Sequence, residues 1–84
     1  MTDHFYRELN IDGLRYVATL LEADGFCSEI VKTISDSFEV EYIWSADFPA
    51  ANIGDASRFR YLESLLHSTA YRQLVELKKK ESAQ

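Results

Sequence analysis

Few side chains in this sequence stand at a spacing that could support catalysis or bind a metal ion. His4 and His67 are far apart, and neither lies at ligand spacing from another histidine, a cysteine or a carboxylate. A thiol near a helix start can be activated, but Cys27 follows Phe26, which favours a buried structural thiol. The sequence therefore predicts no metal site and no cofactor.

Glu39 and Glu41 are the nearest approach to a catalytic pair of carboxylates. Residues i and i+2 do not face one another on a helix. On a strand they share a face, but nothing supplies the apolar pocket that would make one an acid and the other a base. The sequence also contains no nucleophile motif and no glycine-rich phosphate loop. We therefore expect a protein that is not an enzyme and has no catalytic residues.

The acidic and aromatic stretch around Trp44 is the strongest functional signal. Tyrosine and tryptophan dominate the hot spots of protein interfaces, and charges at the rim steer association. The chain has five Tyr, five Phe and one Trp, which are more aromatic rings than so small a core can hide. We predict a protein-binding surface made of Glu39, Glu41, Tyr42, Trp44, Asp47 and Phe48. The alternative places these rings in the core, so the sequence leaves core and interface open for Trp44.

The division of charge indicates the kind of partner. Residues 1–55 hold eleven acidic and three basic side chains, whereas residues 56–84 hold three acidic and six basic ones, which together give the net charge of −5. An acidic body selects partners by electrostatics, so we expect a protein partner with a basic surface. The basic segment has the composition of a nucleic-acid-binding helix, but the field of an acidic chain repels phosphate. Its residues are Arg58, Arg60, Arg72 and Lys78–Lys80, with Tyr61 and Tyr71 between them.

The composition is typical of one small globular domain over residues 1–84, in which residues 81–84 form a flexible tail. The hydrophobic and aromatic shares, 46% and 13%, exceed those of disordered chains. No apolar run approaches the length of a membrane span. One cysteine allows no intramolecular disulfide, and the first residues lack the apolar segment of a signal peptide. We therefore expect a cytoplasmic protein that does not contact a membrane.

Two segments in the first half resemble capped amphipathic helices. Residues 13–24 follow Asp12 as N-cap, carry apolar residues at helical spacing and end at Gly25, where helices often stop. Residues 29–38 follow Ser28 as N-cap and have apolar residues four apart. Because the connection between the segments is short, we expect an antiparallel helical hairpin.

The longest predicted helix covers residues 56–80, with Asp55 as N-cap. Its apolar stripe runs over five turns, and 25 residues span about 37 Å, which is longer than the preceding helices can cover. An exposed apolar face of this length is usually covered by another molecule. We therefore predict a homodimer whose interface contains Leu62, Leu66, Ala70, Leu74 and Leu77.

Two segments remain open to two interpretations. Residues 2–11 fit either a short helix or an extended arm. Residues 38–44 alternate apolar and acidic side chains, as strands do, but they also continue the spacing of the preceding helix. A lone strand leaves its backbone unpaired, and no second strand is evident, so we favour a helix. Residues 45–54 contain Pro49 and turn residues, which indicates a loop.

The predicted fold is therefore all-α: a small antiparallel bundle of three helices plus a short N-terminal segment, with a strand as the alternative for residues 38–44. The predicted function is that of a non-enzymatic acidic binding protein, which regulates or inhibits a protein partner through the acidic and aromatic surface. A homodimeric structural or assembly protein built on the long C-terminal helix is one alternative. A nucleic-acid binder that uses the basic face of that helix is another.

Overall fold

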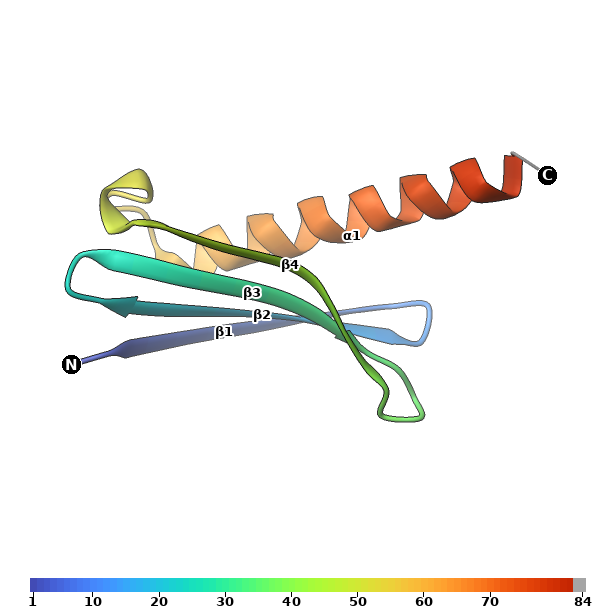
Figure 1. Cartoon of the computed structure of the whole chain (residues 1–84), viewed down its shortest axis with the longest axis horizontal. Helices are drawn as coiled ribbons and strands as arrows, with labels where there is room; N and C mark the ends of the chain where they lie inside the picture. The colour runs from blue at the N-terminus through green and yellow to red at the C-terminus, as the bar shows by residue number, and fades with distance from the viewer. Residues whose placement is uncertain (83–84) are drawn as a thin grey trace.

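The chain folds into a four-stranded antiparallel sheet with a long helix across one face (Figure 1). The computed structural model describes residues 1–82. The strands form a meander in the order β1-β2-β3-β4. The elements are β1 (Asp3–Ile11), β2 (Leu14–Ala23), β3 (Phe26–Ile34), β4 (Val40–Pro49), the 3-10 helix η1 (Ala50–Asn52) and α1 (Arg58–Ser82).

This architecture contradicts the predicted all-α bundle, because strands account for 48% of the chain and helix for 32%. Residues 13–24, predicted as a helix, form β2. Since β2 lies between two other strands, it buries Tyr16, Val17 and Ala18 in succession. A strand that is apolar on both faces carries a nearly continuous apolar run. Such a run also contains residues three and four apart, which imitated the stripe of a helix.

The second predicted helix, residues 29–38, is also wrong, because most of it belongs to β3. The buried residues of β3 alternate strictly along the strand: they are Cys27, Glu29, Val31 and Thr33. Two of these four are polar, so a search for apolar alternation does not detect the strand. The apolar residues at positions 30 and 34 lie on the opposite face of the sheet, where two-residue periodicity puts them.

Two Asp-Gly pairs form the turns that join the first three strands. Asp12 and Gly13 have φ values of 50° and 80°, and Asp24 and Gly25 have φ values of 52° and 79°. Successive residues with positive φ are required by the two-residue hairpin turn whose twist matches that of its strands. Asp12 and Gly25 are therefore turn residues, and not the helix cap and helix stop that the sequence analysis assigned.

The helix favoured for residues 38–44 is also wrong, because β4 begins at Val40 and continues to Pro49. The loop expected over 45–54 is therefore restricted to the residues after Pro49 and includes η1. The second strand that this segment needs is β3, with which β4 pairs. Val31 lies opposite Trp44 and Lys32 opposite Tyr42, so Ile43 has no opposite residue and forms a β-bulge. The N-terminal segment is extended and pairs with β2 as β1.

The long C-terminal helix is present as α1. Ser57 occupies the N-cap position instead of Asp55, and its Oγ accepts a hydrogen bond from the Arg60 backbone N–H at 3.4 Å. The helix continues to Ser82, two residues into the segment 81–84 for which we expected a tail. Residues 83–84 lie outside the described part of the chain.

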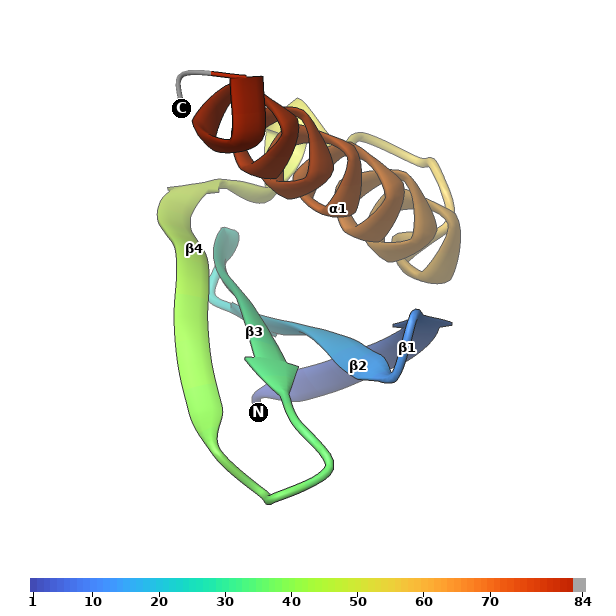
Figure 2. The same cartoon turned by 90° about the vertical axis from the view of Figure 1, so that its right-hand side faces the viewer.

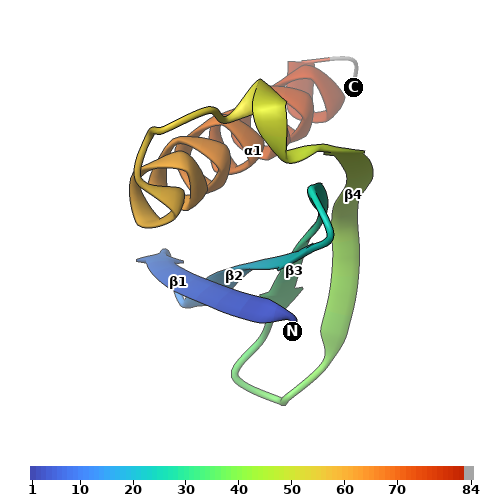
Figure 3. The ribbon, with the colours of Figure 1, turned by 90° about the vertical axis from the view of Figure 1, so that its left-hand side faces the viewer.

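The core lies between α1 and the face of the sheet that it covers. Leu62 and Leu66 of α1 pack with Tyr16 and Leu20 of β2 and with Val31 of β3, and all five are almost completely buried. Figures 2 and 3 show β1 and β2 below the helix, whereas β4 stands to one side and leads through η1 back to α1. The acidic and aromatic residues of β4 are therefore held at an edge of the sheet.

Candidate functional site

The predicted binding surface lies along β4, an edge strand. We call Glu39, Glu41, Tyr42, Trp44, Asp47 and Phe48 the acidic–aromatic edge. The first five are exposed, and Tyr42 and Trp44 keep 70% and 40% of their surface in contact with solvent. Phe48 is half-buried against the core, with its ring centroid 5.8 Å from that of Tyr61. Phe48 therefore supports the edge from inside and offers little surface to a partner.

The side chains of the acidic–aromatic edge lie on both faces of the sheet. Paired residues of neighbouring strands point to the same face. Trp44 and Glu41 lie opposite Val31 and Thr33, which are buried beneath α1, so both point to the helix side. Asp47 lies opposite Ser28 on the other face, and the Ser28 hydroxyl donates a hydrogen bond to it. The edge therefore presents acidic groups on both faces of the sheet: Glu41 on the helix side and Asp47 on the other.

Trp44 is attached to the core by its indole nitrogen. Its Nε1 donates a hydrogen bond of 2.5 Å to one oxygen of Glu29, and the Tyr61 hydroxyl donates to the other. Glu29 is only 3% exposed. Burial and the bond to Glu29 raise the pKa of Tyr61, so the phenol keeps its proton and remains a donor. Trp44 is therefore only partly buried: its N–H is held inside while part of its ring faces solvent.

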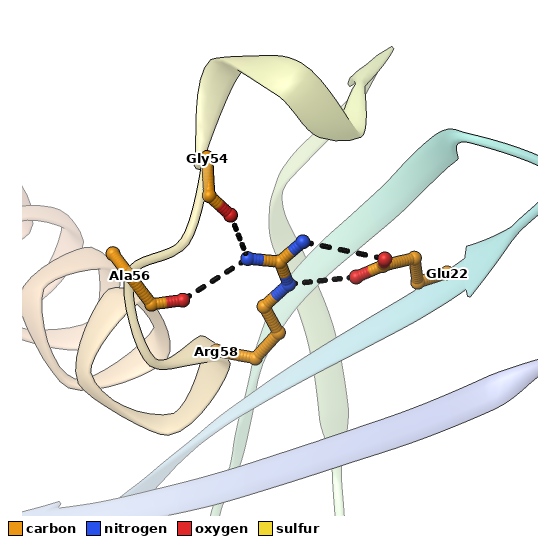
Figure 4. Close-up of polar contacts among 4 residues, drawn as sticks. All are labelled: Glu22, Gly54, Ala56 and Arg58. Carbon is orange, nitrogen blue, oxygen red and sulfur yellow. Dashed lines mark hydrogen bonds and ion pairs between the residues drawn. The ribbon is translucent and has the colours of Figure 1, made fainter.

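A second polar cluster joins the start of α1 to β2 (Figure 4). The Arg58 guanidinium donates to the two carboxylate oxygens of Glu22 at 2.7 and 3.3 Å, and to the backbone carbonyls of Gly54 and Ala56 at 2.6 and 3.0 Å. This two-pronged contact lowers the pKa of Glu22. The cluster fixes the loop before α1 against the sheet, and it uses most of the hydrogen-bonding capacity of Arg58 for internal contacts.

Cys27 lies beside this cluster and is buried. Burial, reinforced by the Glu22 carboxylate, raises the pKa of its thiol. A thiol that keeps its proton is a poor nucleophile. The geometry accordingly suits a structural cysteine.

The basic residues of α1 are divided between internal and exposed positions. Arg58 is engaged by Glu22, and Tyr61, which the sequence placed among basic residues, points into the core and binds Glu29. Arg60, Arg72 and the lysines remain exposed on the helix. Two residues of the nucleic-acid-binding pattern are thus committed to contacts within the chain, and no observation favours that function.

The five predicted dimer residues divide into two groups along α1. Leu62, Leu66 and Ala70 are buried beneath the helix of their own chain, at 2% exposure or less. Leu74 and Leu77 are 37% and 48% exposed, because α1 extends beyond the end of the sheet that it covers (Figure 1). Only this last part of the predicted interface is accessible to a second copy.

A groove runs between the bulge of β4 and the middle of α1. Carboxylates from both sides line it, with one cation: its residues include Glu41, Tyr42, Trp44, Arg72, Gln73 and Glu76. Glu41 and Glu76 carry two negative charges against the one positive charge of Arg72, so these three leave a net charge of −1 in the groove. The acidic character of the edge therefore extends onto the helix, a feature that no pattern within either segment indicates.

A metal-binding cluster and a membrane-spanning helix are both absent from residues 1–82. No group of three or more His, Cys, Asp or Glu residues in this range could hold a metal ion. None of the helical segments described combines the length and the apolar composition needed to cross a membrane. The chain matches no family model, no curated protein and no solved structure.

Proposed function

We propose that this protein is a non-enzymatic binding protein that recognises a protein partner with a basic surface through the acidic–aromatic edge, and thereby regulates or inhibits that partner. The observation that carries the proposal is the position of β4. It is a terminal strand of the sheet, and it exposes Tyr42 and Trp44 between the carboxylates of Glu41 and Asp47. Exposed aromatic rings within a rim of charge are the usual composition of a protein-binding hot spot.

Tyr42 is the best residue with which to test the proposal, because its side chain forms no hydrogen bond or ion pair among the described residues, whereas the Trp44 indole is bonded to Glu29. It is 70% exposed, and Tyr71 on α1 is a matched control at 69%. The partner is first captured from native lysate with the unmodified protein, and its affinity for each variant is then measured. Tyr42→Ala should weaken binding by about 2 kcal/mol if Tyr42 is a hot spot, and Tyr71→Ala should not. Equal affinities of both variants and the unmodified protein would refute the proposal.

The charges of the edge provide an independent kinetic test. Glu39→Gln with Glu41→Gln should slow association with the partner and flatten the dependence of the association rate on salt, because rim charges act mainly on encounter. Asp3→Asn with Asp12→Asn removes the same amount of charge at the two ends of β1 and is the matched control.

We expect the binding to occur in the cytoplasm, where a free thiol such as that of Cys27 persists.

A second copy of the chain is the second candidate partner, favoured by the exposed apolar residues at the end of α1. Leu74 and Leu77 are 37% and 48% exposed. Leu74 and Leu77 are three residues apart and therefore share one face of α1, which a second copy would cover. Sedimentation at tens of micromolar tests this directly. A dimer that becomes a monomer with Leu74→Glu and Leu77→Glu supports the candidate, and a monomer of 9.7 kDa for the unmodified chain excludes it.

A further inference from the structure

We propose that the partner binds by adding an extended, basic strand to the outer edge of β4. This inference rests on the proposed function and specifies how the acidic–aromatic edge is used. An edge strand presents a row of backbone N–H and C=O groups to any extended chain of suitable sequence. The side chains of the edge then decide which chains can pair with it.

The outer edge of β4 is accessible in the described part of the chain. Within residues 1–82, β4 pairs with β3 alone, and Figures 2 and 3 agree that β4 stands at the side of the molecule. The other edge strand, β1, is tied to α1. The ring centroids of Phe5 and Phe59 lie 5.5 Å apart, and Arg7 Nε lies 3.6 Å from Glu63 Oε1. A partner strand therefore has better access to β4 than to β1.

The regular part of this edge runs from Trp44 to Phe48. The bulge at Ile43 interrupts the pairing on one side, and Pro49, which has no backbone N–H, ends the run on the other. Between them β4 pairs residue by residue with β3 without a shift. The five residues of this run are enough to pair with a short extended segment, because strands of about this length are common.

The charges of β4 argue against pairing between two copies of this chain. In an antiparallel pair centred on Asp47, its carboxylate would lie directly opposite Asp47 of the partner subunit, and other registers still gather the Glu41 and Asp47 carboxylates of both copies along one edge. Like charges directly opposite one another destabilise a sheet. Charges and bulges are the usual devices against self-association of edge strands. The same charges favour a strand that carries lysine or arginine.

Both faces of the added strand would meet acidic groups of this protein. On the helix side, a basic side chain would reach the groove that contains Glu41 and Glu76, beside the exposed part of the Trp44 ring. A cation over a tryptophan ring is itself favourable. On the opposite face, the next residue of the strand would approach Asp47. The best partner segment is therefore extended and has basic residues on both of its faces.

Synthetic peptides can test the inference. The probe is a short peptide of alternating valine and threonine with lysine on both faces, and its binding to the whole protein is followed by NMR and by titration. A peptide with glutamate in place of lysine is the charge control. Two further peptides carry N-methyl groups on alternate residues, so that one or the other edge of the peptide can no longer donate backbone hydrogen bonds. An added strand forms backbone hydrogen bonds along one edge of the peptide, so N-methylation of that edge alone interferes with it. Contact through side chains alone forms no backbone hydrogen bonds, so neither N-methylated peptide is affected.

We expect the lysine peptide to bind and to protect amides of β4 from hydrogen exchange, and we expect the glutamate peptide to fail. One N-methylated peptide should bind at least about tenfold more weakly, and the other should bind like the parent. Equal binding of both N-methylated peptides would overturn strand addition while leaving the acidic–aromatic edge as the binding surface. Failure of the lysine peptide to bind would also overturn it. The proposed function would then still be judged separately, by the effect of Tyr42→Ala on the captured partner.

Discussion

At the scale of single residues, the least expected feature is a buried carboxylate. Glu29 lies beneath α1 and receives hydrogen bonds from Tyr61 and Trp44, one on each oxygen. A carboxyl group is tolerated in a core only when its oxygens are hydrogen-bonded. The same contacts hold the Trp44 ring at the edge of the sheet, so the stability of the core and the shape of the proposed binding surface depend on one another.

Tyr61→Phe should therefore destabilise the protein without changing its packing volume appreciably. The variant removes one donor and leaves an oxygen of Glu29 buried without its partner, which costs about 1–3 kcal/mol. Urea unfolding followed by fluorescence measures the difference. Tyr71→Phe makes the same chemical change at an exposed tyrosine, and it should alter stability by less than about 0.5 kcal/mol. Similar stabilities of the two variants would show that Glu29 does not depend on the Tyr61 hydroxyl.

The ion pair between Glu22 and Arg58 should make stability depend on pH. Since Arg58 lowers the pKa of Glu22 in the folded protein, the contribution of Glu22 is complete above the ordinary glutamate pKa of about 4.3. It is lost as the pH falls from there through the lowered value. The stability difference between the unmodified protein and Glu22→Gln should therefore shrink as the pH falls through this range. Urea unfolding at a series of pH values measures this difference, and a constant difference would contradict the assigned role of the ion pair.

At the scale of the elements, the hairpin turns determine how the strands pair. Gly25 has a φ of 79°, and no atom of a described residue other than its chain neighbours lies within 4 Å of the position that a Cβ would occupy. A substitution there meets a backbone penalty and no steric clash. The cost of replacing this glycine therefore measures the conformational demand of the turn by itself.

Gly25→Val should destabilise the protein by about 1–2 kcal/mol, because a β-branched residue is strained at positive φ. Gly25→Asn should cost much less, because asparagine tolerates this region. Thermal unfolding of the two variants provides the comparison. If both variants lose the same stability, the turn does not impose the left-handed conformation in solution.

At the scale of the whole molecule, the core is a single thin layer between one helix and one sheet. A chain of this size has only a few kilocalories per mole of net stability. The buried part of α1 must supply much of it, because Leu62 and Leu66 are at most 2% exposed. The end of the helix lies beyond the sheet and contributes little to this layer.

Leu66→Ala should therefore cost about 2–5 kcal/mol, enough to unfold a large fraction of the molecules. Leu77→Ala, at a position that is 48% exposed, should cost less than about 1 kcal/mol in the monomer. Circular dichroism during urea unfolding measures both. Equal losses would mean that the end of α1 is buried as deeply as its middle, as in a dimer, and sedimentation of the same samples would then show the dimer.

The sequence alone was sufficient for features that depend on nearby residues. The apolar stripe of α1 repeats over many turns, and no arrangement of the rest of the chain changes its period. The exposure of the acidic residues along β4 was also predicted, because hydrated carboxylates stay at the surface in almost any fold. The two Asp-Gly pairs were equally local signals of hairpin turns. They were misinterpreted because aspartate is also a common N-cap residue and glycine also commonly follows the end of a helix. These residues alone do not distinguish a hairpin turn from a helix boundary.

Only the tertiary structure decided that the first half of the chain is a sheet and that Trp44 is held by Glu29. The stretch from Leu14 to Leu21 is apolar on both faces, so its pattern fits a helix and a central strand alike, and the choice between them depends on whether neighbouring strands can pair with it. Glu29 meets Tyr61, and Glu22 meets Arg58, across separations of 32 and 36 residues. No local periodicity encodes such contacts, because they exist only once the meander has closed beneath α1.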